Sequence, residues 1–424
     1  MNVLFISANT ETINMPTLPI GLGLVAAATQ KAGHQVRFLD LMIEDAPEAA
    51  LSSAIAENRP QAIGISIRNV DDQMSTGSRF LLEAARYVVA QCKALSHALV
   101  ILGGAGYSMF PESALEFLGA DMGIQGEGEA SFVTLLETLA ANGDPSGVPG
   151  LYIRGKGCRT PRTFITRLDD LPFPDPTIFN VERFKDPSYF LPFQTRRGCP
   201  LRCSYCATAC IEGAQVRMRG IDVVVKELSR WRDAGFRRIF FVDNTFNLPP
   251  NHARQLCDRL IEANLELKWR AIFYPCRTDP ALVQAMAQAG CTEVSLGFES
   301  GHPQILSWIG KRFDPEDVRH TSQMFGDAGI RRMGFLLLGG PKETKETVME
   351  SLRFAESLNL EAIKVTVGIR IYPYTRLADE ARADGTIDFA DDLLHPRFYI
   401  RRDLEPWLRE TVTDWTASRP TWLA

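Results

Sequence analysis

The sequence lacks long apolar segments, and none of its hydrophobic runs approaches the roughly eighteen residues that are needed to cross a bilayer. It also lacks a basic stripe, because 51 acidic residues outnumber 46 lysines and arginines and the formal net charge is −5. Its start, Met1-Asn-Val-Leu-Phe-Ile-Ser7, lacks the charged region and cleavage site of a signal peptide. We therefore expect a cytoplasmic protein whose partners include neither a membrane nor nucleic acid.

Cysteine occurs nine times, an odd count without the spacing of a disulfide framework. This usage favours a reducing compartment. The six histidines are scattered, and none lies within forty residues of the cysteines at 199–206.

Residues 1–140 alternate short apolar runs with helical patterns, which is typical of a doubly wound, Rossmann-like α/β sheet. The pattern predicts parallel strands at 3–7, 35–39, 62–67 and 99–102, and helices at 20–32, 47–58, 79–95 and 111–118. Ligands of such sheets bind beyond the carboxyl ends of the strands. The residues that gather at these ends are Ser7, Ser66, Gly103, Gly104, Gly126, Glu127, Gly128 and Glu129. Tight turns would explain the glycines without a ligand, and the absence of Gly-x-Gly-x-x-Gly after the first strand argues against an ordinary dinucleotide site.

A second alternating series spans residues 193–384 and predicts an open, partial (β/α)6 barrel, in which chemistry takes place at the carboxyl ends of the strands. Its strands are expected at 193–197, 238–242, 267–273, 293–298, 333–338 and 363–369, and its helices at 220–233, 250–263, 279–289, 314–328 and 343–357. The proline- and glycine-rich residues 141–192 are predicted to link the two domains. Residues 385–424 are rich in aromatic side chains but too short for a core of their own, so we expect this tail to cover the barrel mouth or to close its open side.

Three cysteines, Cys199, Cys203 and Cys206, directly follow the first strand of the barrel. On one tight loop, their thiolates can bind three irons of a four-iron, four-sulfur cluster and leave the fourth iron open for another ligand. A zinc knuckle is the alternative, with Cys210 as a fourth ligand, although no second Cys-x-x-Cys pair occurs.

With these motifs the chain resembles the radical S-adenosylmethionine (SAM) enzymes, and among them the branch with an N-terminal cobalamin-binding domain. In chain order, the motifs are Leu102-Gly-Gly-x-x-x-x-x-Phe-Pro-Glu112, Gly126-Glu-Gly-Glu129, Arg197-Gly-Cys-Pro with the three cysteines and Tyr205, Phe241-Val-Asp-Asn-Thr245, Leu296-Gly-Phe-Glu-Ser-Gly301, Leu338-Gly-Gly-Pro-x-Glu-Thr344 and Ile371-Tyr-Pro-x-Thr375. The resemblance implies three cofactors: a four-iron four-sulfur cluster, SAM and cobalamin.

The resemblance also assigns residues to the SAM site. Asp243, or a backbone carbonyl beside it, would accept a hydrogen bond from the SAM ammonium. The matching motifs add Asn244, Glu299, Ser300, Gly339 and Gly340 as SAM-binding residues, with Glu299 and Ser300 facing the methionine or ribose.

An arginine suits the SAM carboxylate, because its planar fork matches two oxygens. Arg270 in the third strand and Arg370 in the sixth are the candidates for this role. An ordinary ion pair with another part of the chain is the alternative for each of them.

The chain departs from the family pattern at two points. It has no Asp-x-His-x-x-Gly, so no histidine of that motif would reach the cobalt of cobalamin from below. Tyr374 replaces the glycine of the sixth-strand motif and offers a phenol near the active-site mouth, unless it belongs to a peripheral loop.

Cys276, just past the third strand, is a candidate to bind a soft substrate atom or to donate hydrogen, with an inert buried thiol as the alternative.

The function that these features favour is cobalamin-dependent methyl transfer to an unactivated centre of a small molecule. The alternatives are transfer of the 3-amino-3-carboxypropyl group of SAM and a cobalamin-assisted rearrangement. A cobalamin- or metal-binding sensor without activity is disfavoured by the intact set of Cys199, Cys203 and Cys206. We further expect an electron donor of the flavodoxin or ferredoxin type.

Overall fold

The N-terminal domain of the computed structural model, which describes residues 1–11, 16–184, 186 and 189–423, is a doubly wound α/β domain, as predicted. Its sheet has the order β2-β1-β3-β4-β5-β6-β7, and β1 to β5 are parallel. The parallel strands are β1 (Asn2–Ser7), β2 (Gln35–Asp40), β3 (Ala62–Ser66), β4 (Leu99–Gly103) and β5 (Met122–Ile124). The order reverses between β1 and β3, which is the point where sheets of this kind bind ligands.

Successive side chains of β1 project to opposite faces of this sheet. Val3 and Phe5 pack with α1 (Ile20–Lys31) and α6 (Gly128–Ala140), whereas Leu4 and Ile6 pack with the helices of the opposite face. Those helices are α2 (Pro47–Asn58), α3 (Leu82–Leu95) and α5 (Pro111–Leu118). Burial on both faces explains why the strands appear in the sequence as continuous apolar runs.

The predicted linker begins with structure that belongs to the first domain. Within residues 141–192, β6 (Leu151–Ile153) pairs antiparallel with β5, and β7 (Gly157–Cys158) pairs antiparallel with β6. These two strands extend the N-terminal sheet at its edge. They are too short to leave an alternating hydrophobic pattern, so no signal for them appears in the sequence. Residues 185, 187 and 188 of this segment lie outside the described part of the chain.

The second domain is a partial barrel, as predicted. Its parallel strands are β8 (Leu191–Phe193), β11 (Arg238–Phe241), β12 (Lys268–Phe273), β13 (Cys291–Glu299), β14 (Arg331–Leu338) and β15 (Ala362–Val367). The helices that alternate with them are α8 (Ile221–Asp233), α9 (Pro250–Ala263), α10 (Pro280–Gln288), α12 (Pro315–Asp327) and α13 (Lys345–Ser357). The shorter elements are β9 (Arg196–Arg197), β10 (Arg217–Met218), α7 (Thr208–Glu212), α11 (Pro303–Ile309), β16 (Ile369–Arg370) and α14 (Arg376–Ala383).

The aromatic tail is built into the barrel domain. Within it, β17 (Phe398–Tyr399) pairs with β16, and β18 (Trp422–Leu423) adds a seventh strand beside β15. The intervening helix α15 (Glu405–Ala417) packs on β15, and Trp422 is buried in the core cluster of the barrel. The tail therefore extends one open edge of the sheet; residue 424 lies outside the described part.

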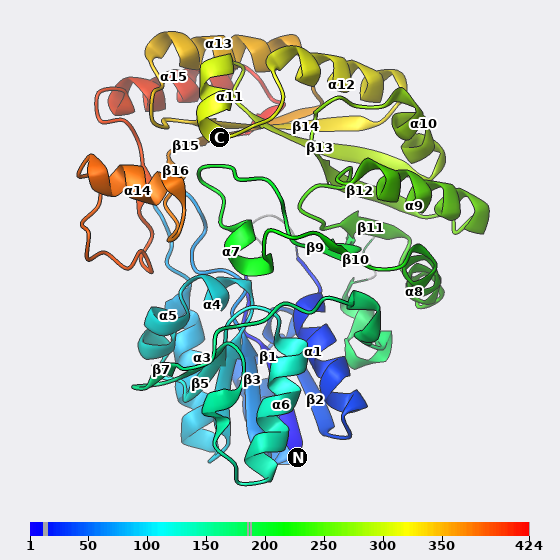
Figure 1. Cartoon of the computed structure of the whole chain (residues 1–424), viewed down its shortest axis with the longest axis vertical. Coiled ribbons are helices and arrows are strands. Elements are labelled where there is room, and N and C mark those ends of the chain that lie inside the picture. Colours follow the sequence, from blue (N-terminus) through cyan, green and yellow to red (C-terminus); the bar gives the residue numbers. More distant parts are fainter. Residues whose placement is uncertain (12–15, 185, 187–188, 424) are drawn as a thin grey trace.

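The two domains lie one above the other, with α7 between them (Figure 1). A loop of the first domain, residues 67–81, reaches the barrel. There Asp71 pairs with Arg370 at 2.8 Å, with both side chains buried, and Ser75 donates a hydrogen bond to the carbonyl of Val367. None of the described helices is long and apolar enough to cross a membrane.

Candidate functional site

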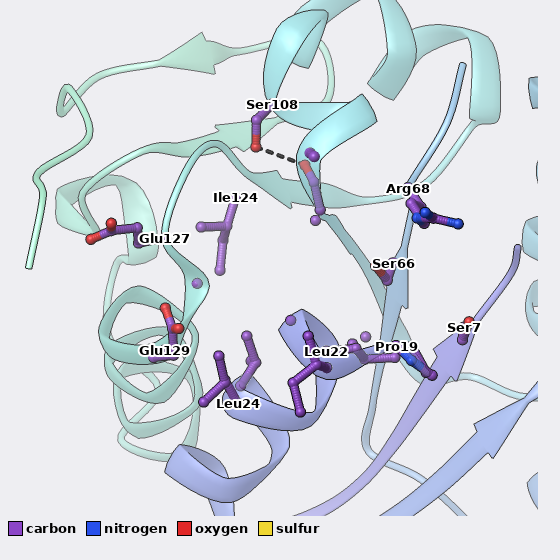
Figure 2. A pocket seen from close by; sticks show the side chains of 18 of the residues that line it. Ser7, Pro19, Leu22, Leu24, Ser66, Arg68, Ser108, Ile124, Glu127 and Glu129 are labelled. Atoms are coloured by element: carbon purple, nitrogen blue, oxygen red, sulfur yellow. Dashed lines mark hydrogen bonds between the residues drawn. The ribbon is translucent and has the colours of Figure 1, made fainter. Parts of the chain in front are cut away.

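A cavity of ≈ 400 Å³ lies at the carboxyl ends of β1, β3 and β4. Leu22, Leu24 and Ile124 project around it, with Glu127 and Glu129 along one side (Figure 2). Every N-terminal residue that the sequence marked as a ligand contact lines this cavity: Ser7, Ser66, Gly103, Gly104, Gly126, Glu127, Gly128 and Glu129. The barrel domain completes the wall with Pro192, Gln194, Arg197, Ile211, Glu212 and Val242.

Glycines keep part of the cavity wall flat. A Cβ at Gly21 would meet no atom within 4 Å, and one at Gly103 would meet only the carbonyl of Ile124, at 4.0 Å. Gly104 has a left-handed φ of +98°, and a Cβ there would lie 2.6 Å from the carbonyl of Ile67. A flat, mostly apolar wall with a few polar groups suits a broad planar ligand such as a corrin ring.

Two residues of the cavity were missed by sequence reasoning. Ser108 donates a hydrogen bond to the carbonyl of Gly104 at 2.7 Å and accepts one from the backbone N–H of Gly126 at 2.9 Å, so it ties two glycine segments together. Arg68 lies two positions beyond Ser66 and lines the side opposite Glu127 and Glu129 (Figure 2). The signal that could have found it is a cation just past the end of a buried strand.

Glu127 and Glu129 face arginines of the barrel domain. Glu129 lies 2.5 Å from Arg197, and Glu127 lies 2.6 Å from Arg217 and 3.5 Å from Arg197. Burial opposes ionisation of Glu129, but the Arg197 guanidinium outweighs it and lowers the pKa of this carboxyl. The two glutamates therefore join the cavity to the chain that leads into Cys199.

The cysteine loop is anchored to its neighbours by backbone hydrogen bonds. Cys199 donates to the carbonyl of Gly213 at 3.0 Å, and Cys206 donates to that of Cys203 at 3.1 Å. Ser204 donates to the carbonyl of Ile309 at 2.8 Å and accepts a bond from the N–H of Leu377 at 2.9 Å. These contacts fix the backbone of the loop that carries the three thiols.

The donor set fits an iron–sulfur cluster. Burial raises the pKa of Cys203 to about 11, so a thiolate at this position requires a compensating cation such as bound iron. Among the described residues, no three Cys, His, Asp or Glu side chains are placed to hold a single metal ion, which is the arrangement that a zinc knuckle needs. In a cubane cluster each thiolate binds a different iron, so the three sulfurs need not converge on one point.

The end of β11 braces this loop. Asp243 is fully buried and accepts hydrogen bonds from the backbone N–H and hydroxyl of Thr195, at 2.8 and 2.6 Å. It also accepts a bond from the backbone N–H of Arg196 at 3.2 Å. Asn244 donates to Glu212 at 2.7 Å. Both predicted SAM contacts thus position the segments on either side of the cysteines, and their contact with SAM stays a prediction.

Glu299 forms a buried polar group beside the cysteine loop. It has a left-handed φ of 65°, and its Oε1 accepts hydrogen bonds from the hydroxyl of Tyr205 at 2.9 Å and from Nζ of Lys311 at 3.2 Å. Lys311 also donates to the carbonyl of Gly297 at 2.8 Å. Sequence reasoning missed Lys311; the only available signal was a lysine twelve positions after a glutamate already assigned to the site.

Ser300 points to another part of the protein. Its hydroxyl lies 2.8 Å from that of Ser351 on α13 and is buried there. The structure therefore shows it fixing the outer helix, and only its neighbour Glu299 reaches the cysteine loop.

The two arginine candidates for the SAM carboxylate are engaged elsewhere. Arg370 donates to Asp71 and to the carbonyls of Ile371 and Leu393, at 2.5 to 2.9 Å. Arg270 lies 3.7 Å from Glu293, with its guanidinium over the rings of Phe190 and Phe240. Both match the ion-pair alternative, whereas Lys311 is a buried cation beside the cysteine loop.

Gly339 and Gly340 form a loop at the end of β14 that is held by a buried carboxylate. The backbone N–H groups of both glycines donate to Oε2 of Glu343, at 2.5 and 2.7 Å. Burial raises the pKa of Glu343 to about 7. This loop is a predicted contact of SAM, and Glu343 fixes its shape.

The two candidate catalytic residues differ in exposure. Tyr374 is 80% exposed and has a left-handed φ of 61°, which matches the peripheral-loop alternative. Cys276 is partly buried and donates through Sγ to the carbonyl of Arg312 at 3.1 Å. Their catalytic roles stay predictions.

Comparison with known proteins agrees with this geometry. The model of the radical SAM superfamily matches residues 194–355, and the model of the B12-binding domain matches residues 6–136. The barrel therefore contains a radical SAM domain, and the N-terminal domain is a B12-binding domain, as the motifs predicted.

Three individual proteins illustrate the likeness. An uncharacterized methyltransferase of Pyrococcus horikoshii is 28% identical over 90% of this chain and 82% of its own length. The tryptophan 2-C-methyltransferase of Streptomyces laurentii is 25% identical over 87% and 73%. The structure of the radical SAM methyltransferase TsrM from Kitasatospora setae, with cobalamin and a [4Fe-4S] cluster bound, has the same fold, with a TM-score of 0.88, 23% identity and coverage of 99% and 92%.

A bulky side chain at Gly21 should weaken cobalamin binding to the B12-binding domain. Gly21 lines the cavity, and a Cβ there would meet no atom within 4 Å, so a larger side chain has room to enter the space of the ligand. Overpacking costs about 1–3 kcal/mol, so Gly21→Leu should weaken binding about tenfold or more. Titration followed by visible absorption measures the dissociation constant. Gly147→Leu, where a Cβ also meets no atom within 4 Å but lines no cavity, is the control. Equal affinity in both variants would show that the ligand lies elsewhere.

The radical SAM domain should show a pH-dependent stability that depends on Glu343. Its pKa is about 7 in the folded protein and about 4.3 in an unfolded chain. The unfolded chain therefore loses the proton first, and stability falls as pH rises between these values, by roughly 4 kcal/mol in total. Anaerobic unfolding at pH 5, 6, 7 and 8 should show this slope in the wild type and in the exposed control Glu346→Gln, and lose it in Glu343→Gln. A difference between wild type and Glu343→Gln that is constant across this range would refute the assignment.

Proposed function

We propose that this protein is a cobalamin-dependent radical SAM methyltransferase that acts on an unactivated centre of a small molecule. One observation carries the proposal: Arg197, which stands two residues before Cys199, lines the cavity of the B12-binding domain and pairs there with Glu129. A group bound in the cavity would therefore lie close to a group bound at the cysteines. The relatives from Pyrococcus horikoshii and Streptomyces laurentii, which match most of this chain, are named methyltransferases, and this supports methyl transfer.

The cofactors have distinct places in this proposal. Cys199, Cys203 and Cys206 would hold the cluster, the residues of the cavity would hold cobalamin, and SAM would lie between Glu299, Lys311 and the Gly339–Gly340 loop. With all three bound, the open iron and the cobalt supply reductive cleavage of SAM and methyl delivery. The chain itself orients these groups and excludes water from the space between the domains.

Lys311 is the residue that we assign to the SAM carboxylate. Its ammonium has three N–H donors, of which Gly297 and Glu299 occupy two. The side chain is 5% exposed, so its charge is poorly screened by solvent. Glu299 opposite it keeps the site close to neutral and fixes the direction of the remaining donor.

Lys311→Met should bind SAM about ten- to a hundredfold more weakly, because a hydrogen bond to a charged group contributes about 1.5–3 kcal/mol. Equilibrium dialysis on the reconstituted protein measures this affinity. Lys345→Met, which removes an exposed lysine over Trp407, should bind SAM as the wild type does. Lys311→Arg retains the charge and should recover part of the loss; full affinity in the methionine variant would remove Lys311 from the site.

Product analysis tests the function itself. Anaerobic reconstitution with iron, sulfide, cobalamin, SAM and a chemical reductant should yield S-adenosylhomocysteine and 5′-deoxyadenosine in equal amounts for each methyl group transferred. Methylthioadenosine would instead indicate transfer of the 3-amino-3-carboxypropyl group. 5′-Deoxyadenosine without S-adenosylhomocysteine would indicate a rearrangement. We also propose that a flavodoxin- or ferredoxin-type protein supplies the electron in the cell.

A further inference from the structure

The cysteine loop reaches the protein surface at one point. Pro200 and Arg202 are exposed, whereas Cys199 and Leu201 beside them are buried. An electron that enters from another protein must arrive near a ligand of the cluster, and this point of the loop lies one residue from both Cys199 and Cys203. A protein that donates an electron to the cluster would therefore contact the surface around Arg202.

Two further exposed arginines stand on loops that contact this point. Arg312 follows Gly310, where an added Cβ would lie 2.9 Å from the carbonyl of Arg202. The backbone of Arg312 accepts a hydrogen bond from Cys276 at 3.1 Å, and Arg277 is the next residue after Cys276. We call Arg202, Arg277 and Arg312 the arginine patch.

The guanidinium groups of the arginine patch have no direct partner among the described residues. In the described part of the chain, its three members take part in no ion pair and no side-chain hydrogen bond, whereas most other arginines of the barrel do. Two carboxylates on the same loops cap helices instead: Asp279 accepts from Ala281 at 2.9 Å, and Asp314 accepts from Asp317 at 2.9 Å. The three guanidinium groups are therefore available to the carboxylates of another molecule.

The net negative charge of the whole chain favours binding of an acidic partner at this patch over binding elsewhere on the surface. The formal net charge of the chain is −5, so an acidic protein is repelled by most of its surface and attracted where positive charge is exposed. None of the three arginines lines the cavity between the domains, which disfavours a small anionic ligand and favours a partner with a broad surface.

We propose that the arginine patch is the docking surface for an acidic one-electron carrier protein that reduces the cluster. The proposal rests on the proposed function, because it requires a cluster at Cys199, Cys203 and Cys206. One electron leaves the reduced centre of the carrier and enters the cluster; the carrier is oxidised by one electron, and no bond forms or breaks.

The test compares a protein donor with a chemical one. The reconstituted triple variant Arg202→Glu/Arg277→Glu/Arg312→Glu is mixed anaerobically with flavodoxin hydroquinone or with dithionite, and cluster bleaching is followed by stopped flow without a methyl acceptor. At low salt the rate with flavodoxin should fall at least about tenfold, and the rate with dithionite should stay unchanged. The wild-type rate with flavodoxin should also fall as salt rises, whereas the rate of the variant should not. Arg353→Glu, an exposed arginine on α13, is the matched control and should behave as the wild type.

Two outcomes would overturn the proposal: an unchanged flavodoxin rate in the triple variant, and an equal loss in Arg353→Glu. If the unchanged flavodoxin rate is accompanied by weaker binding of SAM or substrate, the patch is a small-molecule subsite instead. If the glutamate variant holds less cluster, the triple lysine variant decides: it retains the charges and should keep the wild-type rate and salt dependence, and their loss would contradict the proposal. The assay follows reduction of the cluster and measures no methyl product. It can therefore be interpreted even if the protein proves not to be a methyltransferase.

Discussion

The buried contact of Arg197 with Glu127 and Glu129 is the interaction on which the rest of the site depends. It joins the wall of the B12-binding cavity to the residue that stands two positions before Cys199. Breaking such a pair by removing one partner is costly, about 3–5 kcal/mol, because the other charge remains buried and unpaired. The second arginine, Arg217, also contacts Glu127, so two cations face two carboxylates and the group is neutral as a whole. The position of the cysteine loop relative to the cavity is thereby fixed by electrostatics rather than by apolar packing alone.

The cysteine loop has few hydrogen bonds within itself and takes its shape from outside. Asp243 holds the entry to the loop, Glu212 holds Gly198, and Ile309 and Leu377 hold Ser204. These contacts come from α7, which directly follows the loop, and from three segments that are distant in sequence: the residues after β11, α11 and α14. A cluster that is bound by one short loop gains rigidity from this arrangement, since each neighbour restricts a different part of the turn.

Much of the fold was predictable because its elements have strong local signals. Buried parallel strands appear as apolar runs, and the long barrel helices have clear amphipathic patterns, so most of their predicted bounds lie close to the observed ones. The first barrel strand is the exception: it was predicted at 193–197, but β8 ends at Phe193, and residues 196–197 form β9, which pairs antiparallel with β10. The short strands β6, β7 and β18 were missed, because two- or three-residue strands at a sheet edge leave no period to detect. The cavity residues were predictable for a topological reason: strand ends of a parallel sheet meet at one edge, whatever their separation in sequence.

The charged residues of the site were harder to assign, because their roles depend on partners that the sequence does not reveal. Arg370 matches a SAM-binding arginine by position, yet Asp71, 299 residues away, occupies its guanidinium. Ser300 and Glu299 are adjacent, but a left-handed backbone at Glu299 turns one toward the cysteine loop while the other contacts α13.

The same reasoning explains why a lysine suits the position of Lys311. A buried arginine would present five donors that need partners, whereas this lysine presents three and has two of them satisfied. The one donor that remains is aimed by the two that are bound. A single point charge with one free donor gives less geometric selectivity than an arginine fork, so the orientation of a bound carboxylate must also depend on Glu299 and on the Gly339–Gly340 loop. This dependence gives Glu343 its importance, because it is the buried group that sets the conformation of that loop.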